Sequence, residues 1–145
     1  MDEMLCRGKR LDNDEWVKGF LLKGNNTYIA TLDAVNYMVV SISGTACLEL
    51  EVVAPETVGR YIGKRDKNGK RIFDKDIVKH YNWAEFPEHF VIHVVEWDAK
   101  RFRWSMRNPW TGECYTVGGD CIYEVIGNTI DNPELLQAEN RQEQE

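Results

Sequence analysis

The sequence predicts an all-β protein built as a small barrel-like or rolled antiparallel sheet, with a short C-terminal helix. Short stretches rich in β-branched and aromatic residues recur along the chain, and clusters of Gly, Asn, Asp and Pro separate them at steady spacing. Strands do not alternate with long amphipathic helices, so a βαβ architecture is excluded. The chain has 145 residues, 43 % hydrophobic and 29 % charged, which is the length and composition of one globular domain.

The N-terminal residues 1–53 predict two strand pairs. Glu15–Leu22 and Thr27–Leu32 are rich in β-forming residues, and the Lys-Gly-Asn-Asn segment between them has turn chemistry. Tyr37–Ser43 and Ala46–Val53 form the second predicted pair, around Gly-Thr. Because apolar and acidic residues alternate in Ala46–Val53, we expect a half-buried strand there.

Residues 54–63 predict a seam between two groups of strands. Pro55 cannot donate a hydrogen bond to a strand ladder, and the residues after it have the composition of a short turn. Beyond the seam, Asp66–Gly69 predicts a tight turn with glycine at a position of positive φ. Arg71–Val78 then predicts strand, corner and strand, with the corner at Asp74–Asp76.

Residues 64–131 predict a β-meander. Phe90–Trp97 is the strongest predicted strand, and Asp98–Arg101 turns the chain into Phe102–Met106. Alternation in that strand places Phe102 and Trp104 on one face. Further short strands are predicted at Cys114–Val117 and Ile122–Ile126.

The C-terminal residues 132–145 predict a short helix and a frayed tail. Asn132 is a typical N-cap, and Pro133 suits the first helical position, so the helix opens at Pro133 and continues into the Gln- and Glu-rich end. We interpret residues 1–145 as one domain, with strands, seam, meander and helix in that order.

Charge and hydropathy predict a cytoplasmic protein without a membrane segment. The net charge is −6, from 18 basic and 24 acidic residues, which gives no global attraction to nucleic acid or anionic membrane. Residues 61–105 hold 10 basic and 7 acidic residues, whereas residues 106–145 hold 2 and 8. No apolar run reaches membrane-spanning length, and the N-terminus is acidic where a signal peptide would be basic.

We predict no catalytic residue, no metal site and no cofactor. His89 and His93 have helical metal-ligand spacing, but their segment is a predicted strand, where four residues separate side chains by about 13 Å. Cys114 and Cys121 can approach across a turn, yet packed thiols are the favoured interpretation, and whether the two meet stays open. The paired carboxylates Asp74 and Asp76 suit general acid–base catalysis, a divalent ion or a sheet corner, and we favour the corner.

One segment predicts a nucleic-acid contact. Five cations surround the turn after the seam, and a basic turn can follow a phosphate backbone while a nearby tryptophan stacks on bases. Solvated turn tips and core aromatics explain the same pattern without a ligand. The predicted contact residues are Lys64, Arg65, Lys67, Lys70, Arg71 and Trp104.

Several blocks of the sequence resemble the YopX family of phage and prophage proteins. The central blocks are Pro55–Gly63, Asp66–Phe73 and Asp76–Val78; the flanking ones are Arg7–Arg10, Trp16–Gly19, Val95–Trp97, Ile126–Asn128 and Pro133–Leu136. The resemblance implies a phage-associated origin and an all-β fold, and it implies no activity. Lys75 stands where the family's usual turn has glycine, which disfavours a left-handed corner there; Arg60 and Ile62 replace residues that are typically Gln and Thr.

The favoured function is a non-enzymatic binding or assembly module, with a homo-oligomer as the expected state. Unpaired strand edges and many aromatics in a small meander need covering, which another copy, or a phage or host protein, would provide. The alternative is a nucleic-acid-binding small β-barrel that uses the turn at residues 64–71. An enzyme ranks third, because no nucleophile–base arrangement or metal-ligand spacing is present.

Overall fold

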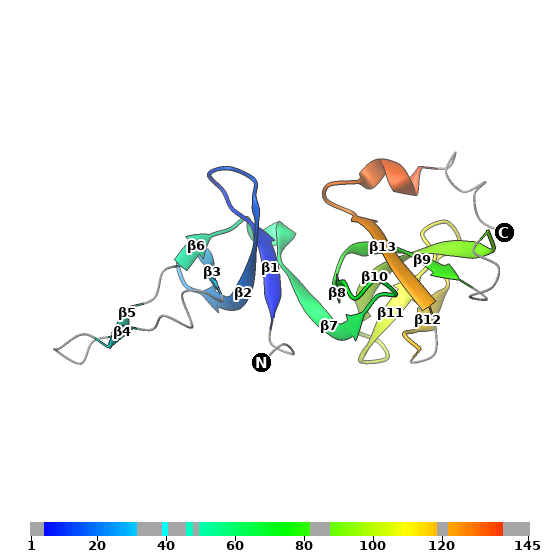
Figure 1. The fold of residues 1–145 in the computed structure, drawn as a ribbon, viewed down its shortest axis with the longest axis horizontal. Helices are drawn as coiled ribbons and strands as arrows, with labels where there is room; N and C mark the ends of the chain where they lie inside the picture. The colour runs from blue at the N-terminus through cyan, green and yellow to red at the C-terminus, as the bar shows by residue number, and fades with distance from the viewer. Residues whose placement is uncertain are drawn as a thin grey trace. The chain divides into compact units, whose positions relative to one another are not determined.

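The computed structural model is all-β, as predicted, and describes residues 5–31, 39–40, 46–47, 50–81, 88–118 and 122–137. The chain divides into two compact units, Met1–Tyr61 and Ile62–Glu145 (Figure 1). The first holds β1 (Cys6–Lys9), β2 (Trp16–Lys23), β3 (Thr27–Thr31), β4 (Val39–Val40), β5 (Ala46–Cys47), β6 (Leu50–Val52) and the 3-10 turn Pro55–Thr57. β7 (Gly59–Arg65) runs from the first unit into the second. The second holds β8 (Arg71–Phe73), β9 (Asp76–Tyr81), β10 (Phe90–Asp98), β11 (Arg103–Arg107), β12 (Cys114–Thr116), β13 (Ile122–Asn128) and the 3-10 turn Pro133–Leu136.

The first unit is built on the strand order β6-β3-β2-β1, which continues through β7 to β8. The predicted first hairpin is confirmed, because β2 pairs antiparallel with β3 and Lys23 lies opposite Thr27. β4 pairs with β5, while the turn predicted between them lies outside the described residues. Cys6, Ile29 and Val53 form the buried core of this unit.

Gly19 of β2 is buried where two backbones approach each other. A Cβ atom added there would lie 1.9 Å from the carbonyl oxygen of Ala30 on β3, closer than any van der Waals contact. Glycine is therefore required at this position for β2 and β3 to pair.

The second unit is a five-stranded antiparallel sheet in the order β12-β11-β10-β9-β13. Side chains from both faces are buried. One face contributes Val78, Val95, Met106 and Tyr123 to a cluster with Ile72 of β8, and the other contributes Ile77, Tyr81, Phe90 and Ile92. Because β10 is buried on both faces, its sequence is nearly continuous in apolar residues, which explains its strong strand signal.

The barrel prediction is wrong for the part of the chain that the structure describes. The five-stranded sheet ends at β12 on one side and at β13 on the other, and these two strands do not pair to close it. Instead β13 pairs with β9, with a bulge between Val125 and Gly127. Burial on two faces here comes from segments packed over an open sheet.

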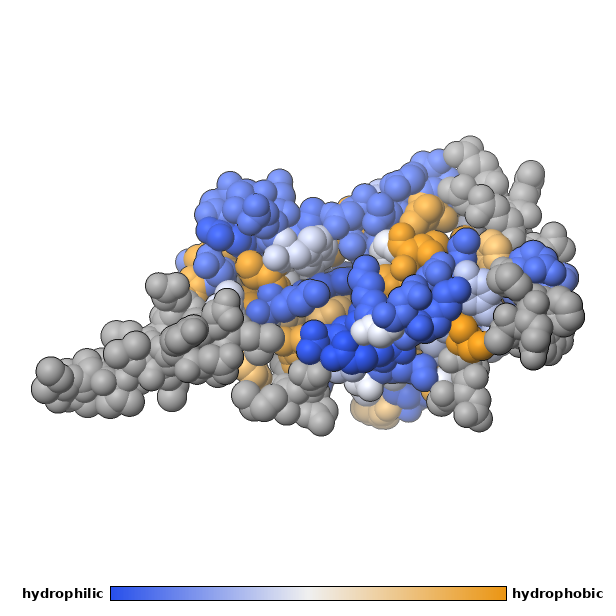
Figure 2. Space-filling view, viewed as in Figure 1, coloured by the Kyte–Doolittle hydropathy of each residue, from blue (hydrophilic) through white to orange (hydrophobic). Residues whose placement is uncertain are grey.

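The predicted C-terminal helix is also wrong, since Pro133–Leu136 forms only a 3-10 turn. The Asn132 side chain makes no capping hydrogen bond to this turn, because its Oδ1 accepts the backbone N–H of Asn128 at 3.2 Å. Leu135 and Leu136 nevertheless pack on the cluster around Ile77, and Figure 2 shows hydrophobic residues beside this turn. The rest of the predicted helix, from residue 138 onward, lies outside the described residues.

The corner between β8 and β9 lies where it was predicted but differs in its backbone. Lys75 adopts φ = 74°. The corner is therefore left-handed, although the lysine at this position led us to disfavour that conformation. Its N–H donates to the carbonyl of Val95 and its carbonyl accepts the N–H of Thr129, each at 2.9 Å. These two bonds offset part of the steric cost of a left-handed residue that carries a side chain.

Candidate functional site

The basic turn between β7 and β8 is held by one carboxylate. Asp66 is 8 % exposed, and its Oδ1 accepts the backbone N–H groups of Asn68 and Lys70, both at 2.9 Å. Gly69 takes φ = 81°, as the sequence predicts. Its N–H donates to the Asp66 carbonyl at 3.0 Å, so hydrogen bonds to Asp66 hold the backbone of the whole loop.

The same turn is fixed to β13. Oδ2 of Asp66 accepts the N–H of Val125 at 2.9 Å, and the N–H of Lys67 donates to the Tyr123 carbonyl at 2.9 Å. The ammonium group of Lys67 lies 3.4 Å from Glu124 Oε2 and 4.5 Å from the ring centre of Tyr81. Burial, and then the neighbouring Glu124 carboxylate, raise the pKa of Tyr81.

The predicted nucleic-acid residues are therefore in different environments. Arg65, Lys67 and Lys70 are exposed, whereas Lys64 and Arg71 are half-buried. Arg65 Nη1 donates to the Gly69 carbonyl at 2.8 Å, and Lys64 Nζ lies 5.9 Å from the ring centre of Tyr123.

Trp104, predicted as a stacking partner, is half-buried against the core cluster that contains Val95. Its indole makes an edge-on contact with Trp97, the ring centres being 5.4 Å apart. Trp104 thus contributes to packing, and Trp97, which is 48 % exposed, is the member of this pair that reaches solvent more fully.

The tip of the β10–β11 hairpin carries an exposed aromatic residue that alternation did not predict. Phe102 lies in the turn before β11 and not on the face of Trp104 as expected; it has φ = 54° and is 80 % exposed. Hairpin loops commonly place glycine or asparagine at a left-handed position. Asp98–Phe102 contains no glycine. This absence is the one sequence feature that could have indicated a left-handed residue with a side chain in this loop.

Asp98 closes this hairpin loop. Its Oδ1 accepts the N–H groups of Lys100 and Arg101 at 3.1 and 3.3 Å, and its Oδ2 accepts Arg101 Nη1 at 2.9 Å. The hydrogen bond from Arg101 lowers the pKa of Asp98. The loop is thus a defined structure that presents Phe102 to solvent.

Two histidines lie close together on the sheet, and no sequence pattern predicted this pair. His80 of β9 and His93 of β10 have ring centres 5.7 Å apart. His93 is 3 % exposed, and burial followed by the proximity of His80 lowers its pKa to about 4. His89, the other member of the pair that we considered in the sequence, precedes β10. Among the described residues, no group of three or more His, Cys, Asp and Glu side chains is arranged to hold a metal ion.

The remaining candidate groups have structural roles where they are described. Asp76 is 1 % exposed and its Oδ2 accepts the N–H of Phe73 at 2.8 Å, while Asp74 pairs with the Lys75 ammonium at 3.2 Å. Cys6 is a buried free thiol whose pKa is raised by that burial. Cys114 is a half-buried free thiol, and the approach of Cys121 lies outside the described residues.

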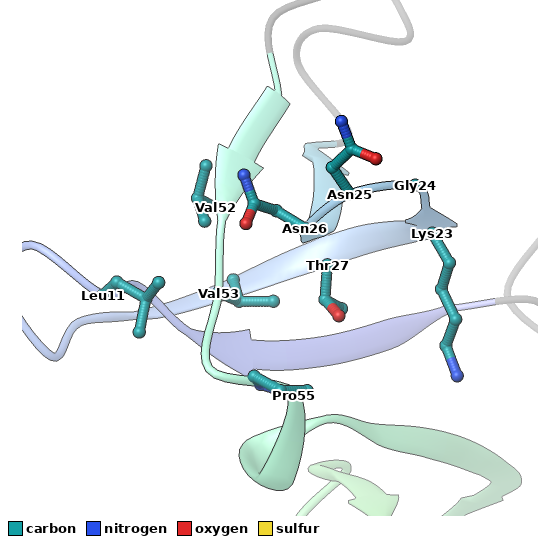
Figure 3. Close-up of a pocket in the computed structure, with 9 residues that line it drawn as sticks. All are labelled: Leu11, Lys23, Gly24, Asn25, Asn26, Thr27, Val52, Val53 and Pro55. Atoms are coloured by element: carbon teal, nitrogen blue, oxygen red, sulfur yellow. The ribbon is translucent and has the colours of Figure 1, made fainter.

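A pocket of about 260 Å³ lies in the first unit. Leu11, Val52, Val53 and Pro55 form its apolar part, and the turn from Lys23 to Thr27 forms its polar part. Figure 3 shows Lys23 on the side away from Leu11, so the cation and the main apolar group do not converge. The volume is also below the ~300 Å³ at which small-molecule sites usually begin, so we assign it no ligand.

Comparison with protein-family models places the chain in a known family. The model of a family described as YopX protein matches residues 7–137. No curated protein matches the chain. Among the described residues, no helix has the length and apolar character needed to cross a membrane.

Proposed function

The chain belongs to the YopX family, a phage-type family without an assigned biochemical activity, and we propose that it is a non-enzymatic binding module. Its contact surface is the tip of the β10–β11 hairpin. The observation that carries the proposal is Phe102, an aromatic residue that is both 80 % exposed and left-handed. Of the paired carboxylates Asp74 and Asp76, the first pairs with Lys75 and the second accepts a backbone N–H group, which favours a structural role for both.

Phe102 contributes two unfavourable free energies to the monomer, and glycine at this position would remove both. A left-handed residue with a side chain costs about 1 kcal/mol or more, and an exposed phenyl ring leaves a large apolar area in water. Strained backbone at an exposed position is typical of functional sites. Burial of this ring against a partner would recover the apolar contribution, and Trp97 would extend the contact.

We propose a second copy of this chain as the partner. Lys100, Arg101 and Arg103 lie next to Phe102 in the sequence, with Asp98 as the only acidic residue of the loop. Residues 106–145 of another copy supply 8 acidic against 2 basic residues. Attraction between these regions of opposite charge would orient the aromatic tip, and salt would weaken it.

Replacing Phe102 by glycine is expected to stabilise the monomer and weaken self-association. Relief of the left-handed strain should raise the free energy of unfolding by about 1 kcal/mol. Thermal unfolding measures this gain, and sedimentation velocity over a range of protein and salt concentrations measures association. Leu11→Gly is the matched control, because Leu11 is 61 % exposed but has no left-handed backbone, and it should give neither effect.

Two results would contradict the proposal. One is a wild-type chain that stays monomeric at every concentration in low salt. The other is a Phe102→Gly variant that associates as strongly as the wild type. Association that does not depend on ionic strength would leave the role of Phe102 intact but would contradict the proposed attraction between regions of opposite charge.

Nucleic-acid binding by the basic turn is a second candidate, favoured by the rigidity of that turn. Asp66 fixes its backbone, so the exposed Arg65 and Lys70 are presented without a large ordering cost. Fluorescence anisotropy with single-stranded and duplex oligonucleotides at low and physiological salt tests this candidate.

Lys70→Gln should weaken any such binding and reduce the salt slope by about 1. Lys23→Gln, which removes an exposed cation from the first unit, should leave it unchanged. Neutralising Lys64, Arg65, Lys70 and Arg71 together should abolish binding, while Lys67 is kept because it pairs with Glu124. Unchanged affinity in that variant would eliminate the turn as a site.

A further inference from the structure

The two imidazoles of the second unit form a pair on one face of the sheet. His80 lies opposite Val91 in the β9–β10 ladder, and His93 lies opposite Val78. Residues two apart on a strand share a face, so the two histidines are diagonal neighbours on adjacent strands. Tyr123 packs against His80 with 5.0 Å between ring centres, and Tyr115 packs against His93 at 5.3 Å.

Their surroundings disfavour the charged form of both imidazoles. Burial lowers the pKa of His80, and burial together with His80 lowers that of His93. Nδ1 of His93 is buried and has no hydrogen-bond partner among the described residues. A buried polar atom without a partner destabilises a fold by about 1–3 kcal/mol, so such an atom calls for an explanation.

The separation of the rings suits a shared metal ion. A divalent ion lies about 2 Å from each ligating imidazole nitrogen, which limits the two ring centres to roughly 6 Å apart. The observed 5.7 Å is within that limit. We propose that His80 and His93 form a two-imidazole binding site for a divalent transition-metal ion such as Zn²⁺, Ni²⁺ or Cu²⁺.

The surroundings favour this class of ion and allow its entry. Imidazole nitrogen prefers these metals to Mg²⁺ and Ca²⁺, which take oxygen ligands. His80 is half-buried and Tyr115 is 46 % exposed, so these two ring neighbours of the buried His93 both reach solvent. The packing of both tyrosines restricts ring rotation, which lowers the ordering cost of coordination. Two protein ligands leave the other coordination positions to water.

The test is metal binding by the full chain after removal of any purification tag. Titration calorimetry with Ni²⁺ or Zn²⁺ should give one equivalent per chain, and the nitrogen couplings in the electron paramagnetic resonance spectrum of bound Cu²⁺ should indicate two imidazoles. His80→Gln and His93→Gln should each reduce the affinity at least tenfold. His89→Gln is the matched control, because His89 is the remaining histidine of the chain, and it should bind like the wild type.

His93 is buried, so its variant needs a check on folding, and the half-buried His80 provides the safer comparison. Circular dichroism should show His80→Gln folded as the wild type is. Added metal should raise the melting temperature of the wild type and of His89→Gln but not that of His80→Gln. Lack of saturable binding, retained affinity in both His80→Gln and His93→Gln, or loss of binding in His89→Gln would each overturn the proposal. None of these results depends on the hairpin tip.

Discussion

Replacing Gly19 by alanine is expected to unfold the first unit. The added Cβ would lie 1.9 Å from the Ala30 carbonyl oxygen and 2.9 Å from the Thr31 Cα, and both are backbone atoms that cannot rotate away. Relief requires β2 and β3 to separate, which also removes their ladder. We expect a loss of about 4 kcal/mol or more, and hydrogen exchange read by mass spectrometry should show lost protection in β2 and β3.

Gly24→Ala is the control for this substitution. Gly24 is exposed in the turn after β2, and an added Cβ there has no neighbouring atom within 4 Å. Its stability should stay within about 0.5 kcal/mol of the wild type. If Gly19→Ala kept full protection in β2 and β3, the close approach of these strands would be disproved.

Replacing Asp66 by alanine is expected to destabilise the second unit by about 4 kcal/mol. The carboxylate accepts three backbone N–H groups, from Asn68, Lys70 and Val125. Hydrogen bonds to a charged acceptor each contribute about 1.5–3 kcal/mol. The expected loss lies near the low end of the sum, because Asn68 and Lys70 are exposed and water can reach their N–H groups. Chemical denaturation followed by tryptophan fluorescence measures the change.

Two comparison variants make this result specific. Asp66→Asn keeps one acceptor oxygen and should lose about half as much stability. Asp12→Ala removes an exposed carboxylate that pairs with Arg10, and surface pairs of that kind contribute less than about 1 kcal/mol. Equal losses for Asp66→Ala and Asp12→Ala would show that the turn is not held by Asp66.

Local chemistry made much of the strand pattern predictable. The β2–β3 hairpin follows from β-forming residues on both sides of a Gly-Asn-Asn turn, and β10 follows from its apolar run. Pairing between distant strands could not be predicted in the same way. Nothing in the sequence of β13 indicates that it joins β9 and leaves β12 at the opposite edge, because alternation fixes the faces of a strand and not its neighbours.

The predictions of a C-terminal helix and of a buried face for Phe102 were wrong for different physical reasons. Asn132 is a residue type that often caps helices, but its side chain accepts a hydrogen bond from the backbone N–H of Asn128. A four-residue segment without a cap does not form a stable α-helix. Phe102 continues the apolar alternation of β11, yet the turn takes it out of the strand. The pairing of His80 with His93 depends on strand register, which the sequence does not reveal.

Lys75, like Phe102, has a left-handed backbone. Unlike Phe102, it is held by hydrogen bonds to distant parts of the chain, which bears on the rates of folding and unfolding. Val95 and Thr129, which bond its N–H and carbonyl, come much later in the chain, and closing such long loops is entropically costly. We therefore expect these hydrogen bonds of the β8–β9 corner to form late in folding, after β10 and the residues following β13 are in place. Strain that arises so late raises the free energy of the native state but not that of the folding transition state. We therefore expect it to speed the unfolding of the second unit and to leave its folding rate almost unchanged.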